Sequence, residues 1–225
     1  MHEIVIRGGT IVDGNGGQPY TGDLAIDGGR ISAVGGKAGP GRREIEADGL
    51  LITPGWVDVH THYDGQATWD PILAPSSWHG VTTTMFGNCG VGFAPVRMRD
   101  HRELIDLMEA IEEIPGTALE EGVRYDWESF PEYLDALERQ PRTIDIAAQV
   151  PHHPLRVYVM GERALRREPA TAEDIATMRD LTREALAAGA FGFTTSRTNS
   201  HKTHTGDFVV VINAEKIKVH PKKYE

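Results

Sequence analysis

The sequence is poor in cysteine and has no long apolar run. Its 225 residues include a single cysteine, Cys89, which excludes an intrachain disulfide. No apolar stretch approaches the ~20 residues that a membrane-spanning helix needs, and the N-terminus lacks the basic-then-apolar form of a signal peptide. We therefore expect a cytoplasmic protein with no membrane partner, in which Cys89 is either a free thiol or a metal ligand.

Positive charge is also scarce. Lysine and arginine total 23, aspartate and glutamate total 33, and the formal net charge is -10. A chain of this charge does not attract phosphate backbones, so no nucleic-acid partner is expected. The composition, 40% hydrophobic and 25% charged, is that of an ordinary globular protein.

Residues 1–54 combine frequent glycine with short runs of alternating apolar residues. The cluster Asp27-Gly28-Gly29-Arg30 separates two such runs and is typical of a hairpin turn. We interpret the glycines as turn residues rather than as phosphate-binding loops, because no helix follows them. This part of the chain is predicted to form a small all-β domain.

From residue 55 onward, strand-like runs alternate with helical ones. Strands are predicted at 57–62, 81–86, 144–150 and 190–195, and helices at 100–113, 130–139 and 171–189. Residues 114–127 are interpreted as a rim or lid loop. This alternation predicts βα units and a parallel sheet, and therefore the α/β fold class.

Two histidines stand at the end of the first predicted strand. His60 and His62 are separated by one residue, so with Asp58 they share one side of a strand. Two imidazoles at the carboxyl end of a strand can share a metal ion. Chance could supply such a pair in a chain with ten histidines, but barrel enzymes collect their catalytic groups at this end of the strands.

Cys89 follows the second predicted strand, whose end lies next to that of the first strand in a parallel sheet. Its thiolate could join the two imidazoles around a soft divalent ion such as zinc. The alternative is a small, buried apolar side chain, a role that cysteine often has. Position alone leaves both interpretations open.

Further polar residues follow the third and fourth strands. His152 and His153 lie between Pro151 and Pro154, which predicts a stiff loop with either a substrate-binding or a structural role for His152. Ser196 and Arg197 follow the fourth strand, where the guanidinium could bind a substrate carboxylate through two hydrogen bonds. A solvated surface arginine is the competing interpretation.

In their order along the chain, several segments resemble the N-terminal part of an amidohydrolase-superfamily enzyme of the N-acyl-D-amino-acid deacylase (D-aminoacylase) group. The segments are Ile11-Val12-Asp13-Gly14, 27–31, 34–35, residues 54–64 with the two histidines, 80–84, 87–95 with Cys89, 150–161 and 192–198. The resemblance implies part of a small β-sandwich domain at 1–54 and the first half of a metal-dependent TIM-type (β/α)8 barrel at 55–207. It also implies His60, His62 and Cys89 as ligands of one or two divalent ions such as zinc (Zn2+), and a small-molecule N-acyl amino acid as substrate.

The family fold implies more than this chain supplies. It implies eight strands, two later histidine ligands and a late aspartate that moves the proton to the leaving amine, and no residue here matches those ligands or that aspartate. A barrel typically takes about 250 residues. The resemblance therefore predicts an incomplete site, and a chain that is inactive and poorly soluble by itself. Its oligomeric state is not predicted.

Residues 208–225 differ in composition, because lysine is concentrated there in a chain otherwise rich in arginine. This tail resembles a segment of a large-subunit ribosomal protein and suggests a different origin. Two other functions stay open: a cyclic-amide hydrolase of the dihydroorotase or hydantoinase type, and a non-catalytic truncated or fused fragment. Cys89, in place of the lysine that bridges the metals in related hydrolases, argues against the first.

Overall fold

The computed structural model describes residues 1–196, without the side chain of Ile111. The chain divides into two compact units, Met1–Gly55 and Trp56–Glu225. Among the helices of residues 1–196, none combines the length and apolar character needed to cross a membrane. The predictions for Arg197 and for the tail from residue 208 lie outside the described residues.

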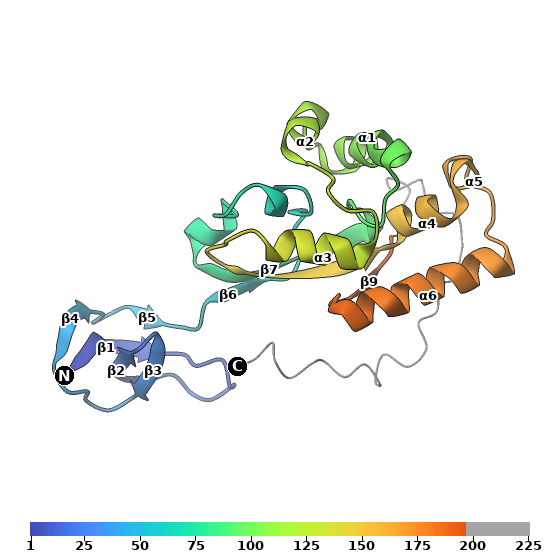
Figure 1. Cartoon of the computed structure of the whole chain (residues 1–225). Helices are drawn as coiled ribbons and strands as arrows, with labels where there is room; N and C mark the ends of the chain where they lie inside the picture. The colour runs from blue at the N-terminus through green and yellow to red at the C-terminus, as the bar shows by residue number, and fades with distance from the viewer. Residues whose placement is uncertain (197–225) are drawn as a thin grey trace. The chain divides into compact units, whose positions relative to one another are not determined.

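The first unit contains one mixed sheet, with strand order β3-β2-β1-β4 and β5 paired to β1 (Figure 1). The strands are β1 (His2–Ile11), β2 (Tyr20–Asp27), β3 (Arg30–Val34), β4 (Gly41–Glu46) and β5 (Leu51–Ile52). The hairpin predicted around Gly28-Gly29 joins β2 and β3, which run antiparallel. Residues 1–55 form this one sheet, and the β-sandwich to which they were predicted to contribute stays a prediction.

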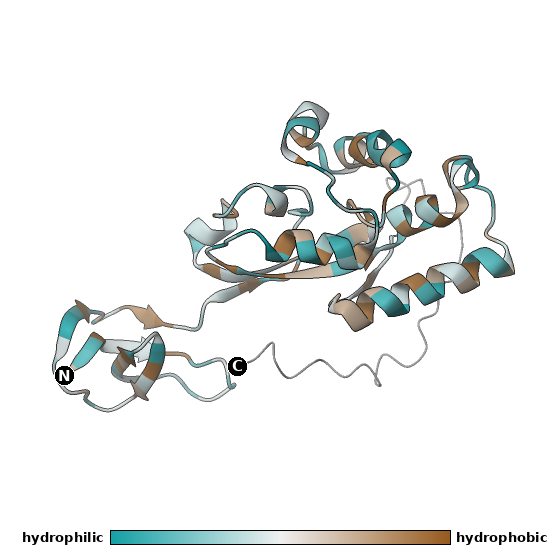
Figure 2. Cartoon of the chain, viewed as in Figure 1, coloured by the Kyte–Doolittle hydropathy of each residue, from teal (hydrophilic) through white to brown (hydrophobic). Residues whose placement is uncertain are grey.

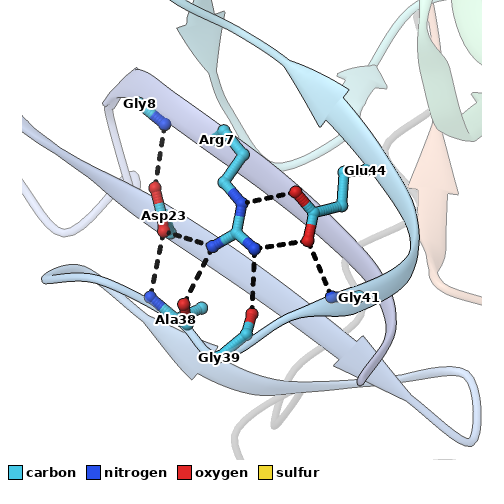
Figure 3. Close-up of polar contacts among 7 residues, drawn as sticks. All are labelled: Arg7, Gly8, Asp23, Ala38, Gly39, Gly41 and Glu44. Carbon is cyan, nitrogen blue, oxygen red and sulfur yellow. Dashed lines mark hydrogen bonds and ion pairs between the residues drawn. The ribbon is translucent and has the colours of Figure 1, made fainter. Parts of the chain in front are cut away.

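Arg7 of β1 ties three strands of the first unit together (Figure 3). Its guanidinium donates to the carboxylates of Asp23, at 2.9 Å, and Glu44, at 2.5 Å, and to the carbonyls of Ala38 and Gly39. Hydrogen bonds from two backbone N–H groups and from Arg7 hold the pKa of the Asp23 carboxyl below its usual range. Arg7 therefore has a structural role within this sheet.

The second unit has a four-stranded parallel sheet in the order β6-β7-β8-β9. The strands are β6 (Trp56–Asp58), β7 (Val81–Phe86), β8 (Asp145–Pro151) and β9 (Gly192–Thr194). Sequential parallel strands that lie side by side are the arrangement of a partial TIM-type barrel. The first strand ends earlier than predicted, so His60 and His62 follow it instead of lying within it.

The α-helices of the second unit lie between β7 and β8 and between β8 and β9, while β6 and β7 are joined through 3-10 turns. They are α1 (His101–Glu112), α2 (Gly116–Gly122), α3 (Phe130–Glu138), α4 (His152–Met160), α5 (Glu162–Leu165) and α6 (Ala172–Ala188), with 3-10 turns η1 (Gln66–Thr68), η2 (Ser76–His79), η3 (Asn88–Gly90) and η4 (Met98–Asp100). Capping boxes begin α3, at Ser129 and Glu132, and α6, at Thr171 and Asp174. The predicted rim loop at 114–127 is wrong, because α2 lies there and buries Leu119.

The predicted loop around His152 and His153 is also wrong. Both residues belong to the first turn of α4 and are buried. The prediction read Pro151 and Pro154 as loop residues. Proline is tolerated in the first helical turn, because the N–H groups of that turn have no intrahelical partner.

One apolar core joins the sheet of the second unit to its helices. Buried members include Phe86 of β7, Val150 of β8, Met108 of α1, Tyr133 of α3 and Met178 of α6. Apolar and polar residues alternate along α3 and α6 (Figure 2), the pattern of helices with one buried side. This packing fixes the strands whose carboxyl ends carry the candidate site.

Candidate metal centre

The segment that carries the two histidines is pinned to strand β7 by the residue between them. The Thr61 N–H and hydroxyl both donate to the Met85 carbonyl, at 3.0 and 2.8 Å. Thr61 is buried, whereas His60 is exposed and His62 is half-buried. The two histidine rings lie close together, with centroids 5.5 Å apart.

Cys89 lies in a tight turn after β7 that needs left-handed backbone at three positions. Gly87, Cys89 and Gly90 have φ of 80°, 56° and 74°. For a residue with a side chain, this conformation costs about 1–2 kcal/mol, so Cys89 must be held in place by its surroundings. The Thr194 hydroxyl of β9 does part of this, since it donates to the Gly87 carbonyl and accepts from the Gly90 N–H.

Asn88 fastens the same turn to the histidine segment. Its side-chain amide donates to the carbonyls of Thr61, at 3.2 Å, and Met85, at 3.1 Å. Its carbonyl oxygen accepts from Gln149 of β8 at 2.9 Å. Asn88 is buried, so these bonds fix the distance between the two segments that carry the candidate ligands.

The structure brings the three predicted ligand side chains together. One ligand atom each from His60, His62 and Cys89 lies within 4.8 Å of the others. Cys89 Sγ is 3.3 Å from His60 Nε2. Two imidazoles and one thiol are ligand types that zinc prefers, so the donor set fits the expected ion.

Burial and two nearby carboxylates raise the pKa of the Cys89 thiol. Burial raises the pKa of Cys89, and the charges of Glu112 and Asp64 raise it further. Because a thiol binds metal as the thiolate, a cation must displace its proton. Glu112 also reaches the cluster directly, with Oε1 3.3 Å from His62 Nε2.

Asp64 is a buried acid beside this cluster. Its side chain is 2% exposed, and Oδ2 has no hydrogen-bond partner among residues 1–196. Burial raises its pKa to about 8, and Glu112 adds to the rise, while the N–H groups of Asp64 itself and of Gly87 oppose it. Sequence reasoning gave no role to Asp64, although it belongs to the same motif as the histidines, or to Glu112, whose place depends on how α1 packs.

Two of the three predicted substrate-binding residues, His152 and Ser196, lie within the described residues, and Arg197 does not. His152 is 2% exposed, and its Nδ1 lies 3.0 Å from the Thr195 hydroxyl. Ser196 is half-buried after β9, and Arg197 lies outside the described residues. The two interpretations of His152, substrate-binding and structural, both stay predictions.

Comparison with known proteins places the chain in a family. The amidohydrolase family model matches residues 43–211. The chain belongs to the amidohydrolase family. This match extends past residue 208, where the different tail was predicted to begin, and the comparisons do not support a ribosomal resemblance of the tail.

Among amidohydrolase relatives, a D-aminoacylase of Alcaligenes xylosoxydans xylosoxydans is 37% identical over 194 residues, which cover 86% of this chain and 37% of the relative. A solved D-aminoacylase with a binuclear metal centre has a TM-score of 0.70 and 34% identity, and the match covers 87% of this chain and 38% of that one. An N-acyl-D-glutamate deacylase of Bordetella bronchiseptica, solved with zinc and a phosphonate inhibitor, has a TM-score of 0.65 and 32% identity, with 86% and 38% covered. The chain thus spans little more than a third of the length of these relatives, and the likeness to a D-aminoacylase is confirmed over that part.

Proposed function

We propose that this chain supplies part of the zinc centre of a hydrolase that removes the acyl group from N-acyl-D-amino acids. The convergence of His60, His62 and Cys89 on one small volume carries the proposal. The names of the relatives, D-aminoacylase and N-acyl-D-glutamate deacylase, support the substrate class. A bound divalent ion would supply Lewis acidity and make water a stronger nucleophile at neutral pH.

Within this proposal, the residues of this chain bind the metal ion and orient its ligands. His60, His62 and Cys89 hold the ion, while Thr61 and Asn88 fix the two segments that present them. The left-handed turn at Cys89 presents the thiol to His60, with Sγ 3.3 Å from Nε2. The aspartate that would accept the proton has no counterpart assigned in this chain.

Zinc binding by the 225-residue chain tests the metal centre. We expect binding in competition with a chromophoric chelator, and a loss of at least about tenfold in affinity for His60→Ala and for Cys89→Ser, because each removes one ligand. Replacement of a surface histidine outside the cluster, His79→Ala, is the control. Equal zinc affinity of all four proteins would refute the metal centre.

A chimera tests the reaction. Residues 1–196 of this chain replace the matching segment of the Alcaligenes D-aminoacylase, and the product is assayed with N-acetyl-D- and N-acetyl-L-amino acids, dihydroorotate and hydantoin. We expect zinc-dependent hydrolysis of the N-acetyl-D-amino acids that disappears with Cys89→Ser. Hydrolysis confined to the cyclic amides would favour the dihydroorotase or hydantoinase alternative instead.

A further inference from the structure

A carboxylate reaches the candidate ligand His62 from a distant part of the chain. Glu112 is the last residue of α1, and its Oε1 lies 3.3 Å from His62 Nε2. We propose that Glu112 is a positioning residue of the metal centre, which holds the His62 imidazole and adds negative charge beside the ion. This inference rests on the metal centre proposed above.

The burial of the pair favours this role over a chance surface contact. The His62 and Glu112 side chains are 14% and 20% exposed, so solvent and salt screen their interaction less than that of an exposed pair. Ligating histidines usually direct their second ring nitrogen to such a carboxylate, which fixes the ring orientation and makes the imidazole a better ligand. Thr61 restrains the backbone on one side of His62, and Glu112 restrains the ring.

The position of Glu112 within its helix points to a cation as well. The carboxyl end of a helix carries partial negative charge and favours cations. The last turn of α1 has no basic residue, and Glu109, Glu112 and Glu113 lie at its end. A divalent ion held at His62 would therefore offset both the helix dipole and the carboxylate, and in its absence this arrangement is unfavourable for α1.

Zinc affinity of matched glutamine variants tests the role. Glu112→Gln keeps the shape of the side chain and removes its charge, and we expect the affinity for zinc to fall about 10–100-fold. Glu109→Gln makes the same charge change at an exposed site one turn earlier, where screening should limit the effect to about twofold. Glu112→Asp keeps the charge on a shorter side chain, and should give an intermediate loss.

The far-UV circular dichroism of each metal-free variant establishes that it folds, and cobalt absorption in the thiolate-to-metal charge-transfer region reports whether Cys89 still ligates. Retained charge transfer with weakened affinity in Glu112→Gln supports a positioning role. Equal zinc affinity of the native chain and Glu112→Gln, or equal losses in Glu112→Gln and Glu109→Gln, would overturn it while leaving the metal centre intact. If the native chain binds no zinc, both proposals fail.

Discussion

At the scale of single residues, Asp64 makes the stability of the metal-free chain depend on pH. Its folded pKa of about 8 lies above the ordinary value of 3.8 that it regains on unfolding. Between these two values the folded state binds more protons than the unfolded state, so stability falls as pH rises through that window. Below the ordinary value the neutral acid costs nothing extra, and above about 8 the whole penalty is present.

Asp64→Asn should therefore stabilise the metal-free chain more at pH 8 than at pH 5. Since one pKa unit corresponds to about 1.4 kcal/mol, we expect the gain at pH 8 to exceed that at pH 5 by up to about 4 kcal/mol. Urea unfolding in the presence of a chelator, at both pH values, measures this gain in the free energy of unfolding. Parallel pH dependence in the native chain and the variant would show that Asp64 is not the titrating group.

At the scale of elements, the turn between β7 and η3 depends on a glycine that approaches β8. A Cβ on Gly87 would lie 2.2 Å from the Gln149 carbonyl oxygen, and its φ is +80°. Gly87→Ala should therefore lower the free energy of unfolding by more than about 2 kcal/mol. The left-handed conformation alone costs about 1–2 kcal/mol, and the backbone clash adds to this cost. The substitution should also weaken zinc binding, since the turn carries Cys89.

Gly80→Ala separates the effect of the left-handed backbone conformation from that of the clash with Gln149. Gly80 has nearly the same φ, +81°, and a Cβ there would meet only the Trp56 ring, at 3.3 Å. This ring is 60% exposed and can move, so we expect a loss of about 1 kcal/mol from the backbone conformation alone. Equal losses in the two variants, measured by urea unfolding followed by tryptophan fluorescence, would show that the approach to Gln149 does not matter.

The elements show what local sequence can and cannot predict. Strand β7 and helix α3 were predicted within a residue or two, because β-branched runs and capping boxes are local signals. The start of α4 at His152 was missed, since its two prolines suit both a loop and a first helical turn. The contact of Glu112 with His62 has no local signal at all, because it depends on where α1 packs.

At the scale of the whole molecule, the sequence pattern predicts the topology but not the layers. The change from an all-β segment to βα alternation near residue 55 was visible in the periodicity, and the structure has a mixed sheet before that point and a parallel sheet after it. The sandwich was predicted from the family resemblance. Residues 1–55 form a single sheet, and no sequence pattern within them shows whether a second layer covers it.

The two units should respond separately to a defect in the first one. Arg7→Met removes the guanidinium that joins β1, β2 and β4, and leaves the carboxylates of Asp23 and Glu44 without their cation. We expect faster amide exchange in these strands and a lower unfolding midpoint for this unit.

All four tryptophans lie from Trp56 onward, so the transition seen by tryptophan fluorescence should keep its midpoint, and zinc affinity should not change. Arg42→Met is the matched control, because the Arg42 side chain is 61% exposed and its pair with Glu3 contributes little to stability. A lower tryptophan midpoint in Arg7→Met would show instead that the two units unfold as one cooperative structure.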